Sequence, residues 1–112
     1  PAPKADGFTT ISVDQLAQKI EHKDPVAVFD ANNQERYNKG HIPGAKWVDA
    51  NKLEASALPQ DKSTEVVFYC ANTQCKASHR AANQASSFGY KRVQVLPEGI
   101  VGWEQAGKPV EK

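Results

Sequence analysis

Residues 66–75 read VVFYCANTQC, and this stretch decides how the rest of the chain is interpreted. An apolar run ends at Cys70, a polar segment follows, and an alanine-rich stretch typical of a helix begins at Ser78. A strand, a tight loop and a helix N-terminus in this order place a thiolate beside unpaired backbone N–H groups and a partial positive charge. Because such an environment lowers the pKa of a thiol, Cys70 is the candidate nucleophile.

The remaining pattern predicts strands that alternate with helices. Apolar runs at 26–29 and 93–96 are typical of buried strands, and 46–49 predicts a brief extended segment. Capping and helix-breaking residues predict helices at 12–20, 34–39, 51–58 and 78–88, and a short helix that runs through Trp103. This order indicates an α/β fold with a central, mostly parallel sheet covered by helices on both faces. Ligands of such sheets bind beyond the carboxyl ends of the strands, where Asp30 and Cys70 are both expected.

Length and charge limit the classes of partner. A chain of 112 residues predicts one domain, which we place at residues 9–112 after a flexible lead-in at 1–8. The formal net charge is +1 and no segment clusters Lys and Arg, so we expect no nucleic-acid partner. No apolar run approaches the roughly 18 residues of a membrane helix, so we expect no membrane partner either. Small molecules are the expected partners.

The two cysteines, Cys70 and Cys75, lie too close in sequence to constrain the unfolded chain much, so a disulfide between them would serve chemistry more than architecture. His41 and His79 lie at no recognised zinc spacing from this pair, and we expect neither a metal nor a cofactor. The chain begins PAPK without a methionine, which fits a trimmed chain or a mature form that has lost a signal peptide. A periplasmic or secreted location and a cytoplasmic one both stay open.

Three ordered motifs resemble the rhodanese family of sulfurtransferase domains over about residues 11–110. The first is VFDA at 28–31 with ERY at 35–37 and GHIPGA at 40–45. The second is FYC at 68–70, with two alanines at 81–82 and Gly-Tyr at 89–90. The third comprises Val-Leu at 95–96, Gly99, Trp103, Ala-Gly at 106–107 and Pro-Val at 109–110. The resemblance implies a rhodanese-like fold.

Two features of the loop depart from the common pattern of single-domain rhodaneses. The family commonly has a six-residue loop that runs from the cysteine to an arginine, whereas here the matching position is Cys75. The alanines at 81–82 also come about two residues later than in that pattern, so the loop is longer. The chain looks most like the rhodanese-like subset that carries two cysteines in a CxxxxC loop.

The resemblance implies a sulfurtransferase that moves a sulfane sulfur from a small anionic, thiosulfate-like donor to a thiol or cyanide-like acceptor through a Cys70 persulfide. Backbone N–H groups of the loop are expected to form an anion cradle. The cradle residues are Ala71, Asn72, Thr73, Gln74, Cys75 and Lys76. Lys76 and Arg80 are expected to attract the donor, and Asp30 is expected to support the site through structural hydrogen bonds.

Cys75 leaves further interpretations open. As a resolving thiol it would attack the persulfide, release sulfide and leave a disulfide that a thioredoxin-like reductant reopens; otherwise it is an incidental loop residue. A CxxxxC redox protein and a non-catalytic or sulfur-carrier binding module remain alternatives. A phosphatase or arsenate reductase is less favoured, because Lys76 provides a point charge where an arginine fork is needed.

Overall fold

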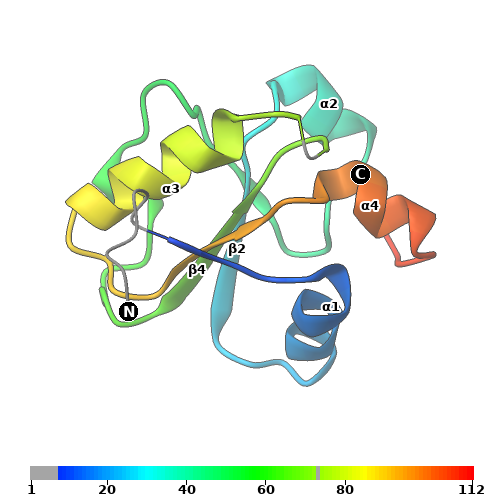
Figure 1. Ribbon diagram of the computed structural model, residues 1–112, viewed down its shortest axis with the longest axis horizontal. Helices are drawn as coiled ribbons and strands as arrows, with labels where there is room; N and C mark the ends of the chain where they lie inside the picture. Colours follow the sequence, from blue (N-terminus) through cyan, green and yellow to red (C-terminus); the bar gives the residue numbers. More distant parts are fainter. Residues whose placement is uncertain (1–7, 73) are drawn as a thin grey trace.

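A five-stranded parallel sheet forms the centre of the protein in the computed structural model, which describes residues 8–72 and 74–112 (Figure 1). The order of the strands across the sheet is β1-β5-β4-β2-β3, and every pair of neighbours is parallel. The strands are β1 (Thr9–Thr10), β2 (Val26–Asp30), β3 (Lys46–Trp47), β4 (Glu65–Tyr69) and β5 (Val93–Leu96). The two central strands, β2 and β4, therefore end side by side, with Asp30 opposite Tyr69.

Helices cover both faces of this sheet (Figure 1). They are α1 (Val13–Glu21), α2 (Gln34–Lys39), α3 (Ala77–Ser87) and α4 (Gly99–Gln105), and a 3-10 turn spans Ala55–Ala57. The α3 helix packs on one face through three buried alanines, Ala81, Ala82 and Ala85. The α1 and α4 helices pack on the other face, where Leu16, Ile100 and Trp103 are buried.

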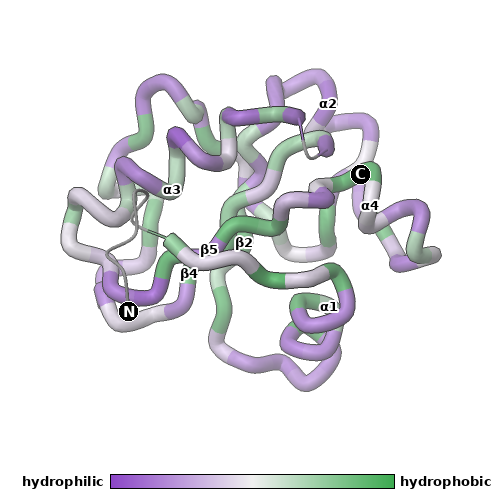
Figure 2. The backbone as a smooth tube through the Cα atoms, viewed as in Figure 1, coloured by the Kyte–Doolittle hydropathy of each residue, from purple (hydrophilic) through white to green (hydrophobic). Residues whose placement is uncertain are grey.

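The strands alternate in which core they supply, as a sheet buried on both faces requires. Phe29, Val66 and Phe68 point to the α3 side, whereas Val28 and Val67 point to the α1 and α4 side. Figure 2 shows this pattern as hydrophobic colour along the central strands and hydrophilic colour along much of the helices. Burying the central strands on both faces leaves their carboxyl ends, rather than their faces, as the place for a site.

Local sequence explains where the main helices begin and end. Ser12 caps α1: its hydroxyl accepts from the N–H of Gln15, and the Gln15 side chain accepts from the N–H of Ser12. Asn33 caps α2 in the same way through the N–H of Arg36. The N-terminal N–H groups of Ile100 and Val101 in α4 donate instead to the carbonyls of Cys70 and Ala71, so this helix begins against the cysteine loop.

The predicted fold class is confirmed, with four differences in detail. The segment 51–58 forms only the 3-10 turn, which has no side-chain N-cap and is followed by Pro59. The edge strand β1 is too short to show an alternating pattern in the sequence, and α3 begins one residue earlier than predicted. The extended segment predicted at 46–49 contributes two residues to the sheet. The lead-in predicted at 1–8 lies outside the described residues except for Phe8, which packs beside α3 on the ring of His79.

No helix in the described part of the chain is both long enough and apolar enough to cross a membrane.

Candidate functional site

Cys70 follows β4 directly and lies at the carboxyl edge of the sheet, with 3% of its surface exposed. Its backbone is fixed by α4, because its carbonyl accepts a 2.9 Å hydrogen bond from the N–H of Ile100. The approach of α4 is close: a Cβ atom on Gly99 would collide with the carbonyl oxygen of Cys70 and lie 2.6 Å from the carbonyl carbon of Ala71. Gly99 also has a φ of +63°, so only glycine suits this position. The sheet and α4 together determine the direction of the Cys70 backbone.

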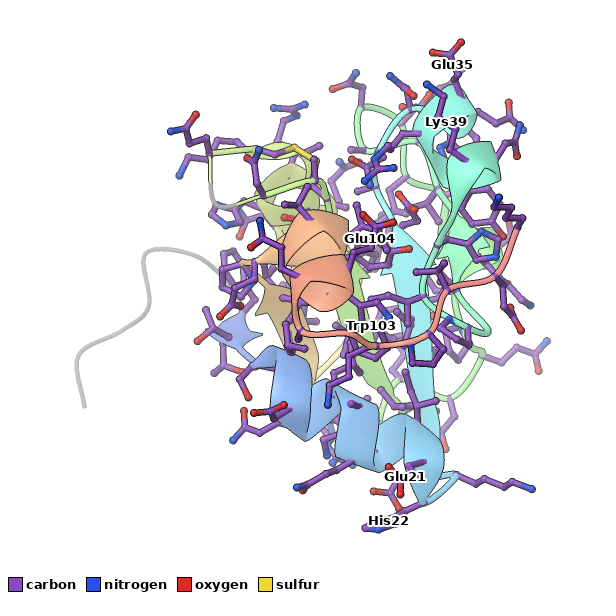
Figure 3. All side chains as sticks on the ribbon, turned by 90° about the vertical axis from the view of Figure 1, so that its right-hand side faces the viewer. Glu21, His22, Glu35, Lys39, Trp103 and Glu104 are labelled. Atoms are coloured by element: carbon purple, nitrogen blue, oxygen red, sulfur yellow. A yellow bond between two sulfur atoms is a disulfide. The ribbon has the colours of Figure 1, made fainter. Side chains whose placement is uncertain are left out.

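A disulfide joins Cys70 to Cys75, with the two Cα atoms 6.1 Å apart. Figure 3 shows it as a yellow bond beyond the end of the sheet, at the same end of the molecule as α2. The loop that it closes is held by Asn72: its Oδ1 accepts from the N–H of Gln74 and its carbonyl from the N–H of Cys75. In this oxidised form two of the predicted cradle N–H groups are therefore engaged inside the loop.

Asp30 lies at the end of the neighbouring strand and is fully buried. Its Oδ1 accepts from the N–H of Asn32 at 2.7 Å and its Oδ2 from the hydroxyl of Tyr69 at 2.9 Å. Burial raises the pKa of the Asp30 carboxyl above its usual 3.8, and these two hydrogen bonds oppose that rise. Asp30 thus organises the backbone after β2, and its two hydrogen bonds link it to Asn32 and Tyr69 rather than to the cysteines.

Asn32, which is not among the site residues predicted from the sequence, lies against the sulfur of Cys70. Its Oδ1 is 3.4 Å from the Sγ atom of Cys70. Its backbone is fixed on both sides, because its N–H donates to Asp30 and its carbonyl accepts a 2.7 Å hydrogen bond from Nε1 of Trp47. The signal in the sequence is its position two residues beyond the end of a buried strand, at the edge where Cys70 is expected.

A groove of about 320 Å³ opens beside Asn32 between the end of β2, the segment after β3 and the first turn of α3. Its charged lining residues are Asp49 and Arg80. A larger hollow of about 600 Å³ lies over β2 and the 3-10 turn. No residue of the cysteine loop lines either hollow, but the smaller groove includes Asn32, which contacts Cys70, and the larger one does not. The smaller groove is therefore the better candidate for substrate.

The structure brings some of the predicted site residues together and leaves others apart. Cys70, Cys75 and Ala71 lie at the carboxyl edge of the sheet with Asp30 behind them, whereas Lys76 and Arg80 lie on the exposed start of α3. Lys76 occupies the N-cap position of that helix without capping it through its side chain. Thr73 lies outside the described residues. His41 is buried in the turn after α2, stacked on Tyr37, with Nδ1 3.0 Å from the Tyr37 carbonyl.

No group of three or more His, Cys, Asp or Glu side chains that would suit a metal ion occurs among the residues at 8–72 and 74–112.

Comparison with known proteins places this site in a family. Residues 12–106 match the model of the rhodanese-like domain. A thiosulfate sulfurtransferase, GlpE of Tolumonas auensis, is 28% identical over 96 residues, which cover 86% of this chain and 88% of that protein. The dual specificity phosphatase Cdc25 of Arabidopsis thaliana is 33% identical over 102 residues, which cover 80% of this chain and 69% of that protein.

The crystal structure of the BH2092 protein from Bacillus halodurans superposes with a TM-score of 0.85 at 26% identity, covering 92% of this chain and 76% of that one. For two other curated relatives, the matched region is about half of their length, 52% of each. The match to the family model extends over most of the sequence and includes the first two motifs and the third as far as Ala106. The chain belongs to the rhodanese-like domain family.

Proposed function

We propose that this domain is a sulfurtransferase that uses Cys70 to take a sulfane sulfur from a thiosulfate-like donor and pass it to a thiophilic acceptor. The single observation that supports this most strongly is the placement of Cys70. It stands at the carboxyl edge of the sheet, with its carbonyl held by α4 and the side chain of Asn32 against its sulfur. A relative named thiosulfate sulfurtransferase aligns with this chain over 88% of its own length.

The first step needs a reduced Cys70. Its thiolate attacks the outer sulfur of the donor, a new bond forms between the two sulfurs, and sulfite leaves with the electron pair of the broken sulfur–sulfur bond. Cys70 then carries a persulfide anion. Arg80 in the groove is the candidate cation for the incoming anionic donor, and Lys76 at the start of α3 is a second.

The second step passes the sulfur on. An external nucleophile such as cyanide attacks the outer sulfur of the persulfide and regenerates the Cys70 thiolate. Alternatively, the Cys75 thiolate attacks Sγ of Cys70, hydrosulfide leaves, and the Cys70–Cys75 disulfide remains until an external dithiol reduces it. The disulfide of this structure favours the second route, because it requires the two sulfur atoms to meet.

The test is to incubate the reduced protein with thiosulfate, remove the excess and weigh the intact chain. Where an external acceptor takes the sulfur, we expect a gain equal to the mass of one sulfur atom, its loss on addition of cyanide, and formation of thiocyanate; where Cys75 resolves the persulfide, we expect hydrosulfide and the disulfide form instead. Cys70→Ser should give none of these. If added sulfur, thiocyanate and hydrosulfide are all missing with the fully reduced wild-type protein and with Cys75→Ser, the proposal is wrong.

Cys75→Ser separates the two routes. This variant is expected to keep the added sulfur and to give thiocyanate with cyanide, but not to release hydrosulfide by itself. Wild-type protein is expected to release hydrosulfide and to return to the disulfide form. Equal hydrosulfide release from both proteins would show that Cys75 is an incidental loop residue.

The phosphatase name of one relative makes hydrolysis the second activity to measure. Two features of the loop argue against it: Cys75 occupies the position of the usual arginine, and Lys76 lacks the planar fork that clasps two oxygens. We expect the protein not to hydrolyse a generic aryl phosphate or reduce arsenate. Hydrolysis by the wild-type protein that is lost in Cys70→Ser would support a phosphatase instead.

A further inference from the structure

We propose that Asn32 is a catalytic hydrogen-bond donor, whose side-chain amide group donates to the thiolate of Cys70 and then to the persulfide formed there. The proposal takes from the proposed function only the role of Cys70 as the reacting atom.

In the oxidised structure the Asn32 amide forms no well-aligned hydrogen bond. Nδ2 is buried and has no such partner among the described residues, and 9% of the residue's surface is exposed. The side chain lies near enough to Asp30 to help lower the pKa of that carboxyl. Leaving an N–H donor unpaired in the interior is costly, and most such groups in folded proteins find a partner. An unpartnered amide at a reactive sulfur therefore indicates that its partner belongs to another state of the site.

The atom nearest to the sulfur in the oxidised form supports this interpretation. Oδ1 of Asn32 lies 3.4 Å from Sγ of Cys70, but a disulfide sulfur carries no proton to donate. A half-turn of the carboxamide exchanges its oxygen with Nδ2 and places the N–H groups of Nδ2 beside the same sulfur, in exchange for the weaker interaction of this side chain with the Asp30 carboxylate. After reduction the Cys70 thiolate is an anionic acceptor, so this orientation supplies the missing partner for the amide.

The backbone of Asn32 is well suited to hold the donor in place. Its N–H and its carbonyl are both engaged, with Asp30 and Trp47 respectively, at 2.7 Å each. The side-chain amide is therefore the part of this residue that remains available, and it stands between Cys70 and the groove. A donor positioned by its supporting contacts loses little freedom when the anion forms.

A neutral donor at this distance favours the charged form of the thiol. Hydrogen bonds to an anion lower the pKa of the group that carries it, and the same N–H groups stabilise the persulfide anion. Other charged or titratable groups lie on the elements around Cys70, and they are Asp30, His41, Tyr69, Lys76, Arg80 and Glu98. Exchanging residue 32 leaves all of these side chains in the protein, but it also removes the interaction of the Asn32 side chain with Asp30. The amide resonance measured below, which needs no change at position 32, therefore complements the variants.

The test uses Asn32→Ala and Asn32→Asp, each in a Cys75→Ser background so that Cys70 is the one thiol. The pKa of Cys70 is measured from the pH dependence of alkylation and from thiolate absorbance. With the donor removed, we expect about tenfold less thiolate at a pH below the pKa in Asn32→Ala, since one hydrogen bond to a charged group corresponds to about one pKa unit. Asn32→Asp keeps the shape but places a carboxylate there, so we expect a larger loss.

Asn33→Asp is the matched control. Asn33 is the exposed neighbour, and aspartate retains its capping of α2, so the same charge is added one residue away. Its effect on the Cys70 thiolate is expected to be much smaller than that of Asn32→Asp. Equal thiolate fractions in all three variants and their Cys75→Ser parent would overturn the proposal.

A second measurement needs no change at position 32. In the reduced protein the nitrogen and proton resonances of the Asn32 side-chain amide should shift with pH at the pKa of Cys70, and in the disulfide form they should not. If the chemical shifts of this amide do not change as Cys70 ionises in the reduced protein, the proposal is overturned, even if a variant fails to fold. Because neither readout involves sulfur transfer, failure here and failure of the persulfide test are distinguishable.

Discussion

The hydroxyl of Tyr69 donates a 2.9 Å hydrogen bond to the carboxylate of Asp30, across the ends of the two central strands. The same hydroxyl accepts a 3.1 Å hydrogen bond from the N–H of Ile42, in the turn after α2. Both side chains are fully buried. One phenol therefore ties together β4, β2 and the turn at the edge of the sheet from which Cys70 follows.

Tyr69→Phe should destabilise the fold more than its size suggests. Removing the hydroxyl leaves the Asp30 oxygen and the Ile42 N–H unpaired in the interior, so we expect the free energy of unfolding to fall by about 1–3 kcal/mol. Urea denaturation measures this. Tyr37→Phe is the control: Tyr37 is half-buried and donates one 2.8 Å hydrogen bond to the Ala45 carbonyl. A loss no larger than that of Tyr37→Phe would contradict the structural role of Tyr69.

The Asp30 carboxyl should make stability decrease as pH rises. Burial raises its pKa above 3.8, so the native state holds this proton more tightly than the unfolded chain. Between 3.8 and the native pKa, the contribution of Asp30 to the free energy of unfolding is therefore lost as pH increases. We expect the difference in that free energy, wild type minus Asp30→Asn, to fall through this window and then level off. Denaturation at a series of pH values measures it.

Asp61 provides the comparison of opposite sign. Hydrogen bonds from the side chain and the N–H of Ser63 lower the pKa of the Asp61 carboxyl below 3.8. Its contribution is present above 3.8 and is lost as pH falls, so the difference between wild type and Asp61→Asn should rise with pH. If both differences in the free energy of unfolding rise with pH, the pKa of Asp30 is not raised.

Gly99→Ala should disturb the cysteine loop. Gly99 and Gly44 both have φ in the left-handed region, at +63° and +83°, so alanine at either costs roughly 1 kcal/mol from the backbone. At Gly99 the added methyl also meets the backbone of Cys70 and Ala71, whereas nothing lies within 4 Å at Gly44. We expect Gly99→Ala to lose more stability, by about 1–3 kcal/mol, and to load sulfur more slowly. Gly44→Ala should load sulfur normally; similar behaviour of the two variants would contradict the close approach of α4.

Reducing the disulfide should make Cys70 available for sulfur transfer while lowering the stability of the fold only slightly. The bridge closes a short loop, with a sequence separation of 5, so its removal is expected to lower the free energy of unfolding by at most about 2 kcal/mol. Chemical denaturation with and without a dithiol reductant measures this, and Cys75→Ser should not respond to the reductant. A loss large enough to unfold the protein would give the disulfide an architectural role.

Most of the fold could be predicted because its elements carry local signals. The apolar runs of β2, β4 and β5 are buried on both faces, and the capping residues Ser12 and Asn33 determine where α1 and α2 begin. The edge strand β1 has two exposed residues, so nothing in its pattern distinguishes it from a loop. The helix expected at 51–58 is a 3-10 turn although most of its residues favour helix, because it has no side-chain N-cap and Pro59 follows it.

By itself the sequence determined the parallel sheet, the position of Cys70 after a buried strand and the presence of a second cysteine five residues later. These depend on periodicity and spacing along the chain. Only the tertiary structure decided what surrounds the sulfur: the amide of Asn32 comes from the segment after the neighbouring strand, 38 residues away, and α4 holds the Cys70 carbonyl. Such contacts are formed where strand ends and a helix meet in space, so no sequence pattern within the loop predicts them.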